Sequence, residues 1–371
     1  MRHLEQLFMR YNSEKMTTKK FILISKYRPP WTSAPLMRVV DKYLERDVEM
    51  FQSRTYLGFR FLNLLFNLIS FNLQLILKTR SIKKIMIYND MSIVIATFPV
   101  LKIISWFRDI GVYYVFDSKW FSVLGDLLKY PWRFALNSQI YKKILIFDSL
   151  LSVYLKEKGV RDEGKFVMIS AGVDLDTFKY KEKARFDKRL IYVGNIHTRR
   201  KLGVMVDAMK IVVKRYSKTK LVVVGAGNDL KNLKKKVKEA KLNKNFIFTG
   251  ELSQEKVARE LINSDICLSQ YPPEDYDIQF PIKIFEYQAA GRPVITTDTT
   301  ATRKYLKNKH DALMTKFDSK ELALAIEELF SNRRLREKIS KNGLKIAKRF
   351  GWEDIVARIR KIVFGGNQNE N

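Results

Sequence analysis

The stretch FPIKIFEYQAAGRPVITT, residues 280–297, joins a short apolar helical run directly to a β-branched strand. The helical run is expected to end at Ala290-Gly291, because glycine readily takes the left-handed conformation that stops a helix, and Pro293 begins the strand. One carboxylate, Glu286, lies within the run. Parallel α/β proteins bind ligands where their strands end, so Glu286 is a candidate binding residue. A buried helix cap with an ion-paired glutamate fits the same spacing.

The rest of the chain repeats this alternation of short apolar strands and helices in two blocks. The strands of the first block are apolar on both faces, as a parallel sheet covered by helices requires. They are expected at 21–25, 84–88, 92–98, 112–116, 144–147 and 165–170. The polar run 179–188 lacks periodic apolar residues and separates the blocks. In the second block, a strand followed by a turn is expected in each of 189–195, 220–228, 246–251, 265–270 and 293–297. Helices are expected at 203–216, 229–241, 253–262, 282–290, 319–329 and 333–363.

The length of the chain also favours two domains. At 371 residues it is too long for one ordinary core and suits two α/β domains of similar size. Two doubly wound, Rossmann-like parallel-sheet domains would face a central cleft. The expected division is 1–15 as an N-terminal extension, 16–178 as the first domain, 179–345 as the second, 346–364 as a final helix and 365–371 as a polar tail.

The net charge of +30 indicates a polyanionic partner, either nucleic acid or an anionic membrane surface. Nucleic-acid binding is not expected, because the sequence has no zinc finger, aromatic RNA-binding signature or KH loop. Each Lys or Arg near an anionic leaflet contributes roughly 1 kcal/mol, so a modest cluster suffices for peripheral attachment. The expected location is therefore cytoplasmic, on the inner face of the membrane.

Cysteine and histidine usage indicates neither a disulfide framework nor a metal centre. The single cysteine, Cys267, lies in an apolar run and cannot form a disulfide within the chain, which fits a cytoplasmic protein. The three histidines share no ligand-like spacing, so a metal site is not expected. No cofactor is expected either.

The strongest membrane candidate is FRFLNLLFNLISFNLQLIL, residues 59–77, whose length approaches the roughly 20 residues that span a bilayer. A spanning helix is not expected, because a polar stripe runs down one side: Asn63, Asn67, Ser70 and Gln74. The segment is either an amphipathic helix packed in the first domain or an interfacial helix that dips into the membrane. Aromatic and basic neighbours fit such an interface: Trp106, Phe107, Arg108, Trp120, Phe121, Tyr130, Trp132 and Arg133.

A basic turn follows the strand RLIYV and precedes a helix. It consists of Gly194-Asn195-Ile196-His197-Thr198-Arg199-Arg200-Lys201. A helix N-terminus favours negative charge by about 0.3–1 kcal/mol, and arginine adds bidentate bonds to phosphate, so the turn is a candidate anion cradle. It is not a Walker loop. A second turn, Gly225-Ala226-Gly227-Asn228, holds only a fragment of the dinucleotide fingerprint and indicates a tight strand–helix connection.

Together these segments resemble the donor domain of the family 4 (group 1) retaining glycosyltransferases, which have the GT-B fold. The resemblance runs through IYVGN…RRK…VDAM, KLVVVGAGN, FIFTGELS, DICLSQYPP and FPIKIFEYQAAGRPVITTD. Upstream, SAGVDLDTF (170–178) is similar to the family's domain junction. Downstream, FGWEDIVARI (350–359) is similar to the closing helix that crosses back to the first domain.

The resemblance implies roles for residues of the second domain. Arg200 or Lys201 would neutralise the donor diphosphate, and Glu286 would hold the ribose. The segment 251–252 would lie beside the base, and the segment 281–283 would offer amides and an ammonium group to the sugar and phosphates. The implied donor-binding set is Gly194, Asn195, Arg199, Glu251, Leu252, Asp277, Pro281, Ile282, Lys283 and Glu286.

The chain departs from the family pattern in three respects. The usual first glutamate of the donor site falls at Ile278, and Asp277 is the candidate substitute for binding the sugar hydroxyls. The glycine-rich loop after the first strand is replaced by 26–33. The first-domain histidine beside the reaction centre is missing, and Asp117, at a comparable strand end, is either a catalytic residue or a helix cap.

The resemblance implies a retaining hexosyltransferase with a UDP- or GDP-sugar donor and a lipid-linked or other membrane-associated glycan acceptor. Its catalytic candidates are Arg200, Lys201 and Asp117, and its acceptor-binding candidates are Arg28, Trp31 and Trp120. One alternative is a nucleotide-sugar epimerase or a phosphorylase on the same fold. Another is a non-catalytic protein that binds polyanions or membranes.

Overall fold

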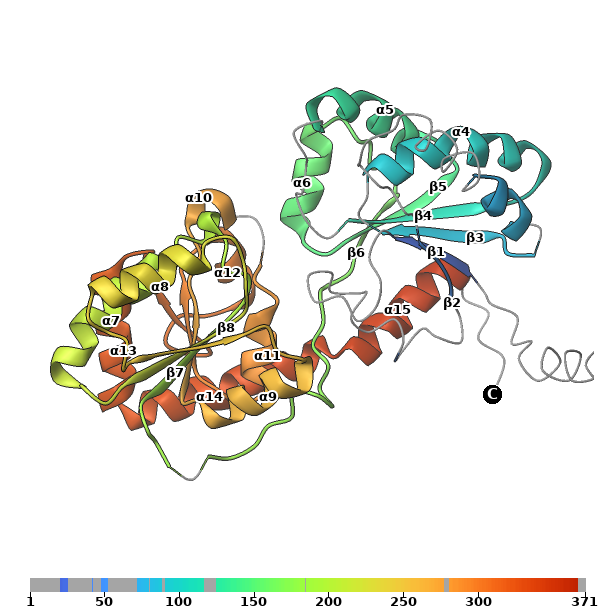
Figure 1. The fold of residues 1–371 in the computed structure, drawn as a ribbon. Coiled ribbons are helices and arrows are strands. Elements are labelled where there is room, and N and C mark those ends of the chain that lie inside the picture. The colour runs from blue at the N-terminus through green and yellow to red at the C-terminus, as the bar shows by residue number, and fades with distance from the viewer. Residues whose placement is uncertain are drawn as a thin grey trace, which may run out of the picture. The chain divides into compact units, whose positions relative to one another are not determined.

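The computed structural model describes residues 21–25, 42, 48–52, 72–79, 81–88, 91–116, 125–183, 185–276 and 280–365. The chain divides into two compact units (Figure 1). Unit 1 comprises Met1–Ser170 and Ile355–Asn371, and unit 2 comprises Ala171–Asp354. The polar run 179–188 thus belongs to unit 2. Each unit contains a six-stranded parallel sheet covered by helices, which confirms the expected α/β class with two doubly wound domains.

The sheet of unit 1 has the strand order β2-β1-β3-β4-β5-β6. Its strands are β1 (Phe21–Ser25), β2 (Val48–Gln52), β3 (Lys84–Tyr88), β4 (Gly111–Phe116), β5 (Tyr141–Ile146) and β6 (Phe166–Met168). Three helices connect the strands from β3 to β6, namely α4 (Met91–Phe107), α5 (Gly125–Asn137) and α6 (Ser149–Glu157). The central strands β3 and β4 are buried almost throughout, as strands covered on both faces must be.

The strand predicted at 92–98 is wrong, because this segment lies in the 17-residue helix α4. Its buried residues recur every three or four positions, at Ile93, Thr97, Leu101 and Ile104, which is the spacing of one helix face. A short apolar run does not separate a buried strand from a buried helix. The sequence reading also missed the short strand β2 in this unit.

The sheet of unit 2 has the strand order β12-β11-β10-β7-β8-β9. Its strands are β7 (Arg189–Val193), β8 (Lys220–Val224), β9 (Phe246–Gly250), β10 (Ile266–Ser269), β11 (Val294–Thr297) and β12 (Leu313–Thr315). Its longer helices are α7 (Gly203–Arg215), α8 (Leu230–Glu239), α9 (Gln254–Asn263), α11 (Lys283–Ala289), α13 (Ser319–Ser331) and α14 (Arg333–Ala347). The strands predicted for this half are confirmed except at their ends, as are the helices predicted between 203 and 329. The strand β12 and the short helices α10 (Pro273–Tyr276) and α12 (Thr300–Tyr305) were not predicted.

The single helix predicted over 333–363 is interrupted. The helix α14 ends at Ala347, and α15 (Trp352–Phe364) begins after an extended residue, Gly351. Val173 pairs with this break: its amide donates to the Phe350 carbonyl at 2.8 Å, and its carbonyl accepts from the Trp352 amide at 3.1 Å. This backbone pairing explains the interruption, which the helical pattern of the sequence did not indicate.

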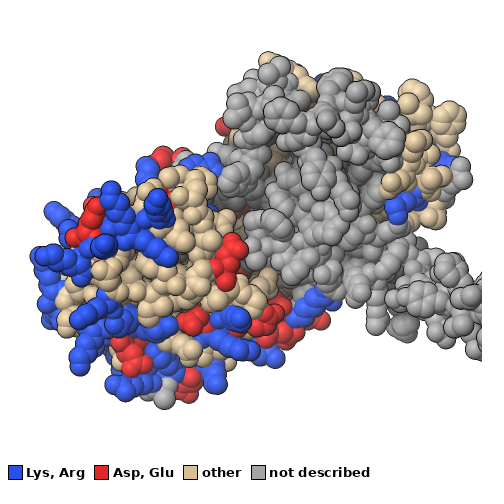
Figure 2. Space-filling model, in the orientation of Figure 1, with Lys and Arg blue, Asp and Glu red and all other residues tan. Residues whose placement is uncertain are grey.

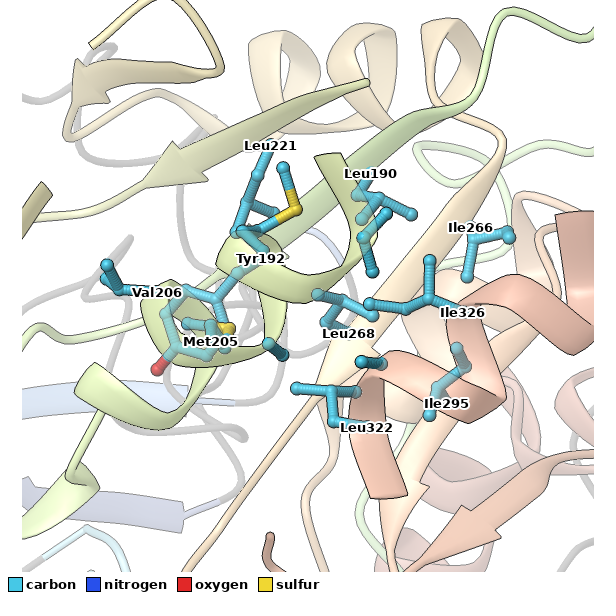
Figure 3. Packing of buried hydrophobic residues seen from close by; sticks show 14 of the residues in the cluster. Leu190, Tyr192, Met205, Val206, Leu221, Ile266, Leu268, Ile295, Leu322 and Ile326 are labelled. Atoms are coloured by element: carbon cyan, nitrogen blue, oxygen red, sulfur yellow. The ribbon is translucent and has the colours of Figure 1, made fainter. Parts of the chain in front are cut away.

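The core of unit 2 holds α7 and α13 against the sheet (Figure 3). Buried side chains of four neighbouring strands face those of the two helices, and the labelled members are Leu190, Tyr192, Leu221, Ile266, Leu268, Ile295, Met205, Val206, Leu322 and Ile326. Burial of apolar side chains stabilises a fold by roughly 1.5–3 kcal/mol each. This packing fixes where the strands end, and with it the edge that carries the candidate site.

The segment 59–77 lies mostly outside the described residues. Its described end is helical from 72 to 78 and packs beside α4, where the Asn72 side-chain amide donates to the Ala96 carbonyl at 3.3 Å. Among the described residues, no helix is both long and apolar enough to cross a bilayer. Trp132, expected among the interface residues, is fully buried instead and packs against Tyr114 and Phe116.

Helix α13 provides a matched test of the core. Ile326 is 0% exposed, whereas Leu324 on the same helix is 63% exposed. The substitution Ile326→Ala should lower the free energy of unfolding by about 2–5 kcal/mol, because it leaves a cavity. Leu324→Ala should change it by less than about 0.5 kcal/mol. Urea unfolding followed by circular dichroism measures both, and equal losses would contradict the packing described here.

Candidate functional site

The candidate site lies at the carboxyl edge of the unit 2 sheet, where the chain changes direction. The strands β7 and β10 are neighbours at the centre of the sheet. From β7 the chain proceeds to β8 and β9 on one side, and β10 is followed by β11 and β12 on the other side. Such a switch point leaves a crevice outside the two central strands, where open parallel sheets bind ligands.

The turns after β7 and β8 pack backbone against backbone. Gly225 has a φ of 135°, and a Cβ at this position would lie 2.0 Å from the Gly194 carbonyl oxygen. Gly227 approaches the Ile196 carbonyl in the same way, with a hypothetical Cβ at 2.1 Å. The Ile196 amide donates to the Ala226 carbonyl at 2.8 Å. The Gly-Ala-Gly sequence is therefore needed for close packing of two turns, which supports its interpretation as a tight connection.

The start of α11 contacts the end of β7. A Cβ at Gly194 would lie 2.7 Å from Lys283 Nζ and 2.9 Å from the Tyr192 hydroxyl oxygen. The ammonium group of Lys283 thus occupies the space that a side chain at position 194 would need. The structure brings these two predicted donor-site residues together, although they are far apart in the sequence.

Tyr287 anchors α11 to the sheet one turn after Lys283. The Val193 amide donates to the Tyr287 hydroxyl at 2.9 Å, and the Tyr287 hydroxyl lies 3.4 Å from the Val193 carbonyl. Burial raises the pKa of Tyr287 well above its ordinary value, so the phenol stays neutral and can act as both donor and acceptor. Glu286, the preceding residue, is also buried, with 6% of its surface exposed.

The cations of the basic turn face the segment after β10. The 3-10 helix η2 (Thr198–Arg200) is followed by Lys201 in the left-handed conformation, at φ 47°. The Arg200 guanidinium lies over the Tyr271 ring, 4.6 Å from its centroid. Lys201 forms an ion pair with Glu274, and this hydrogen bond lowers the pKa of the Glu274 carboxyl. Both contacts link the two sides of the switch point.

The remaining predicted donor-site residues follow the ends of other elements. Asn195 is exposed, and its carbonyl accepts from the Tyr192 hydroxyl at 3.3 Å. Arg199 is exposed, as is Glu251, which follows β9, whereas Leu252 is half-buried. Pro281 and Ile282 are half-buried before α11. The other predicted site residues lie outside the described residues: Asp277, Asp117, Arg28, Trp31 and Trp120.

An open pocket of about 390 Å³ lies where α7 and α13 begin. It is lined by Lys201, Gly203, Val204, Asp207, Lys236, Phe317, Asp318 and Ser319. Of the predicted site residues that the structure describes, only the catalytic candidate Lys201 lines it. Its acidic groups already have partners: Asp207 pairs with Lys236, and Asp318 accepts from the Lys320 and Glu321 amides. Most of the described residues that were predicted for the site therefore lie outside this pocket, at the end of β7, after β9 and at the start of α11.

Positive charge extends well beyond the site. Figure 2 shows Lys and Arg side chains spread over the visible surface of unit 2, with smaller groups of Asp and Glu between them. The segment 201–250 alone holds 13 Lys and Arg residues against 3 Asp and Glu residues. Such a distribution attracts anions in general. Among the described residues, no group of three His, Cys, Asp or Glu side chains is placed to hold a metal ion.

Three residues that hold the site together were not predicted. Tyr271 and Glu274 hold the cations of the basic turn, and Tyr287 holds α11. Tyr271 lies two residues after the last residue of β10, so its place near a strand end was a usable signal. The contact between Glu274 and Lys201 depends on which strands are neighbours, and the sequence does not give that order.

The hydroxyl of Tyr287 allows a direct test of the anchor. Tyr287→Phe keeps the ring but leaves the Val193 amide without its partner, so it should cost about 1–3 kcal/mol of folding stability. Tyr180→Phe, at a tyrosine that is 53% exposed, is the matched control and should be nearly neutral. Urea unfolding of both variants measures the difference, and a neutral Tyr287→Phe would show that the hydroxyl does not hold the helix.

Comparison with known proteins gives a family match for the second half of the chain. Residues 176–346 match the family model described as glycosyl transferases group 1. The phosphatidyl-myo-inositol mannosyltransferase of Mycobacterium leprae is 26% identical over 202 residues, which are 53% of this chain and 52% of that protein. The chain therefore spans about half the length of the curated mannosyltransferases that it matches.

Solved structures match over nearly the whole chain. Anabaena Alr3699/HepE in complex with UDP and glucose has a TM-score of 0.73 at 15% identity, covering 94% of this chain and 100% of that one. The sucrose-phosphate synthase of Thermosynechococcus elongatus has a TM-score of 0.72 at 16% identity, covering 93% of this chain and 98% of that one. At these identities the likeness shows the fold, which is GT-B.

Proposed function

We propose that the protein transfers a hexose from a nucleotide-sugar to a membrane-held acceptor, because residues 176–346 match the family model described as glycosyl transferases group 1. The observation that carries the proposal is the approach of Lys283 Nζ to Gly194 at the switch point of the unit 2 sheet. It brings a cation of the segment 280–297 next to the turn that carries Arg200 and Lys201. A nucleoside diphosphate is the ligand class whose charge suits this grouping.

Each part of the site has a role in this proposal. Arg200, Lys201 and Lys283 would surround the diphosphate, and the absence of a side chain at Gly194 leaves room for the Lys283 ammonium group at this strand end. Glu286 would accept hydrogen bonds from the ribose hydroxyls, and the segment after β9 would lie beside the base. UDP and glucose in the Anabaena structure support a uridine donor, and GDP remains the other candidate.

The proposed catalysis rests on electrostatic stabilisation of the leaving group. The acceptor hydroxyl oxygen would bond to the anomeric carbon while the bond from that carbon to the diphosphate oxygen breaks. The diphosphate leaves with developing negative charge, which the cations of the site would stabilise, and it takes up the acceptor proton. Attack from the face of the leaving group would retain the configuration, as the resemblance to retaining family members implies.

The proposed acceptor is a lipid-linked or other membrane-associated glycan. The Mycobacterium leprae relative is a phosphatidyl-myo-inositol mannosyltransferase, a name that describes a lipid acceptor, and this supports the class. The protein would then work at the cytoplasmic face of a membrane, in glycan or glycolipid biosynthesis. A panel of nucleotide-sugars incubated with the protein and a membrane extract, followed by mass spectrometry of the lipid products, tests the reaction.

Nucleotide binding gives a sharper test of Glu286. Glu286→Gln preserves the shape of the side chain but replaces one acceptor oxygen with a donor, so the affinity for UDP or GDP should fall roughly 10- to 100-fold. Glu239→Gln, at an exposed glutamate of α8, should leave the affinity unchanged. Isothermal calorimetry measures both. Equal affinities would remove Glu286 from the site, and stabilisation by polyanions but not by nucleotides would favour a non-catalytic polyanion-binding protein.

The two cations of the basic turn should matter more for transfer than for folding. Arg200→Ala and Lys201→Ala should each slow transfer by roughly 100-fold, because each removes positive charge from the departing diphosphate. Lys210→Ala, at an exposed lysine of α7, is the control for loss of surface charge and should transfer at the normal rate. Single-turnover assays with saturating donor provide the rates, and three equal rates would rule out this turn as the diphosphate site.

A further inference from the structure

One surface of unit 1 exposes large apolar side chains that the core of the protein does not use. Trp106 is 70% exposed and Phe107 is 81% exposed, at the end of α4. With five others that are each more than half exposed, they form what is called here the apolar helix face: Leu73, Leu77, Ile103, Trp106, Phe107, Tyr130 and Phe134. Soluble proteins rarely expose so many large apolar groups on neighbouring elements unless they bind something there.

The three segments that carry this face lie side by side over the unit 1 sheet. The helix at 72–78 contacts α4 through the hydrogen bond from Asn72 to the Ala96 carbonyl. Phe98 of α4 packs edge to face on Phe134 of α5, with ring centroids 5.8 Å apart. Figure 1 shows α4 and α5 together on one side of the sheet. The exposed residues therefore belong to one layer.

The opposite sides of the same helices are packed. Leu75, Val94, Leu101 and Trp132 are 0% exposed. Each helix has thus already buried one apolar stripe against the sheet, and the apolar helix face is a second stripe on the outside. In α4, which is apolar almost throughout, the outer stripe therefore needs apolar surroundings as the inner one does.

The chemistry of this face matches the head-group region of a bilayer. Trp and Tyr are favoured at that level because each combines an apolar ring with a polar N–H or O–H group. Basic groups accompany them: Arg108 is exposed beside Phe107, and Arg133 lies over the Tyr130 ring, 5.2 Å from its centroid. Asp109 is an exposed acid next to Arg108. Basic and aromatic side chains together favour an anionic lipid surface over an apolar protein partner.

We propose that the apolar helix face binds the surface of an anionic lipid bilayer, with Trp106 and Phe107 inserted at the level of the head groups. The binding is peripheral and requires no spanning helix. It does not depend on the proposed transfer reaction, since it involves neither donor nor acceptor and is measured without them. Loss of vesicle binding and loss of nucleotide binding are therefore distinguishable results.

The test uses the full chain and vesicles of phosphatidylcholine with phosphatidylglycerol. Wild-type protein should sediment with these vesicles, and the double variant Trp106→Ser/Phe107→Ser should bind at least roughly tenfold more weakly. The control is Leu324→Ser/Ile247→Ser, which removes two exposed apolar side chains of unit 2 and should bind normally. Arg108→Glu should weaken binding to these vesicles, because it reverses a charge beside the inserted ring.

A second readout locates the inserted group. Brominated lipids should quench part of the tryptophan fluorescence of the wild type, and Trp106→Phe should bind vesicles but lose that quenching. If circular dichroism shows that the double variant does not fold, the Trp106→Phe variant tests the proposal instead. Quenching that persists in this variant would then contradict insertion of Trp106. The proposal is overturned if the folded double variant binds vesicles like the wild type. It is also overturned if light scattering shows that this variant has instead lost self-association, since the face would then join two copies of the chain.

Discussion

The contact between the end of β7 and the start of α11 determines the geometry of the candidate site. The Val193 amide is bonded to the hydroxyl of Tyr287, a buried side chain, so the helix is held on the strand end. Lys283 precedes Tyr287 by one helical turn and therefore faces the same strand end, where its ammonium group reaches Gly194. A carboxylate at position 286 is carried by the same short helix. The positions of these groups thus follow from one anchoring interaction.

The cations of the basic turn are held less firmly. The pair between Lys201 and Glu274 is more than half exposed on both sides, and exposed pairs contribute only about 0–1 kcal/mol. If the proposed function holds, an arriving diphosphate would replace Glu274 as the partner of Lys201 at little cost in free energy. The ring of Tyr271 would keep Arg200 near the crevice during this exchange. The arrangement thus combines a fixed cation, Lys283, with cations that can adjust.

The sequence predicted the second unit better than the first, and the reasons are local. In unit 2, strands such as KLVVV end at glycines and are followed by helices with clear apolar faces, so strand and helix signals agree. In α4, Pro99 and a nearly continuous apolar run hid the helical period, and the segment 92–98 was mistaken for a strand. The break before α15 depends on backbone pairing with Val173, a residue far away in the sequence.

At the site, the sequence predicted the types of the binding residues. It did not predict the roles of Tyr271, Glu274 and Tyr287, because their contacts depend on the order of the strands and the placement of the helices. No local sequence pattern contains that information.

The two proposed binding functions depend on different forces, although both involve basic groups. At the edge of the unit 2 sheet, backbone turns and a buried anchor fix the cations, so affinity there depends on position more than on total charge. On the apolar helix face, insertion of apolar side chains contributes energy that salt does not screen, and the arginines add a part that salt does screen. The overall charge of +30 would attract the protein to any anionic surface and does not by itself make binding specific for one kind of surface. Selection of lipid over duplex nucleic acid must therefore come from the exposed rings of Trp106 and Phe107, because the bases of a duplex are already stacked and leave no apolar layer for these rings.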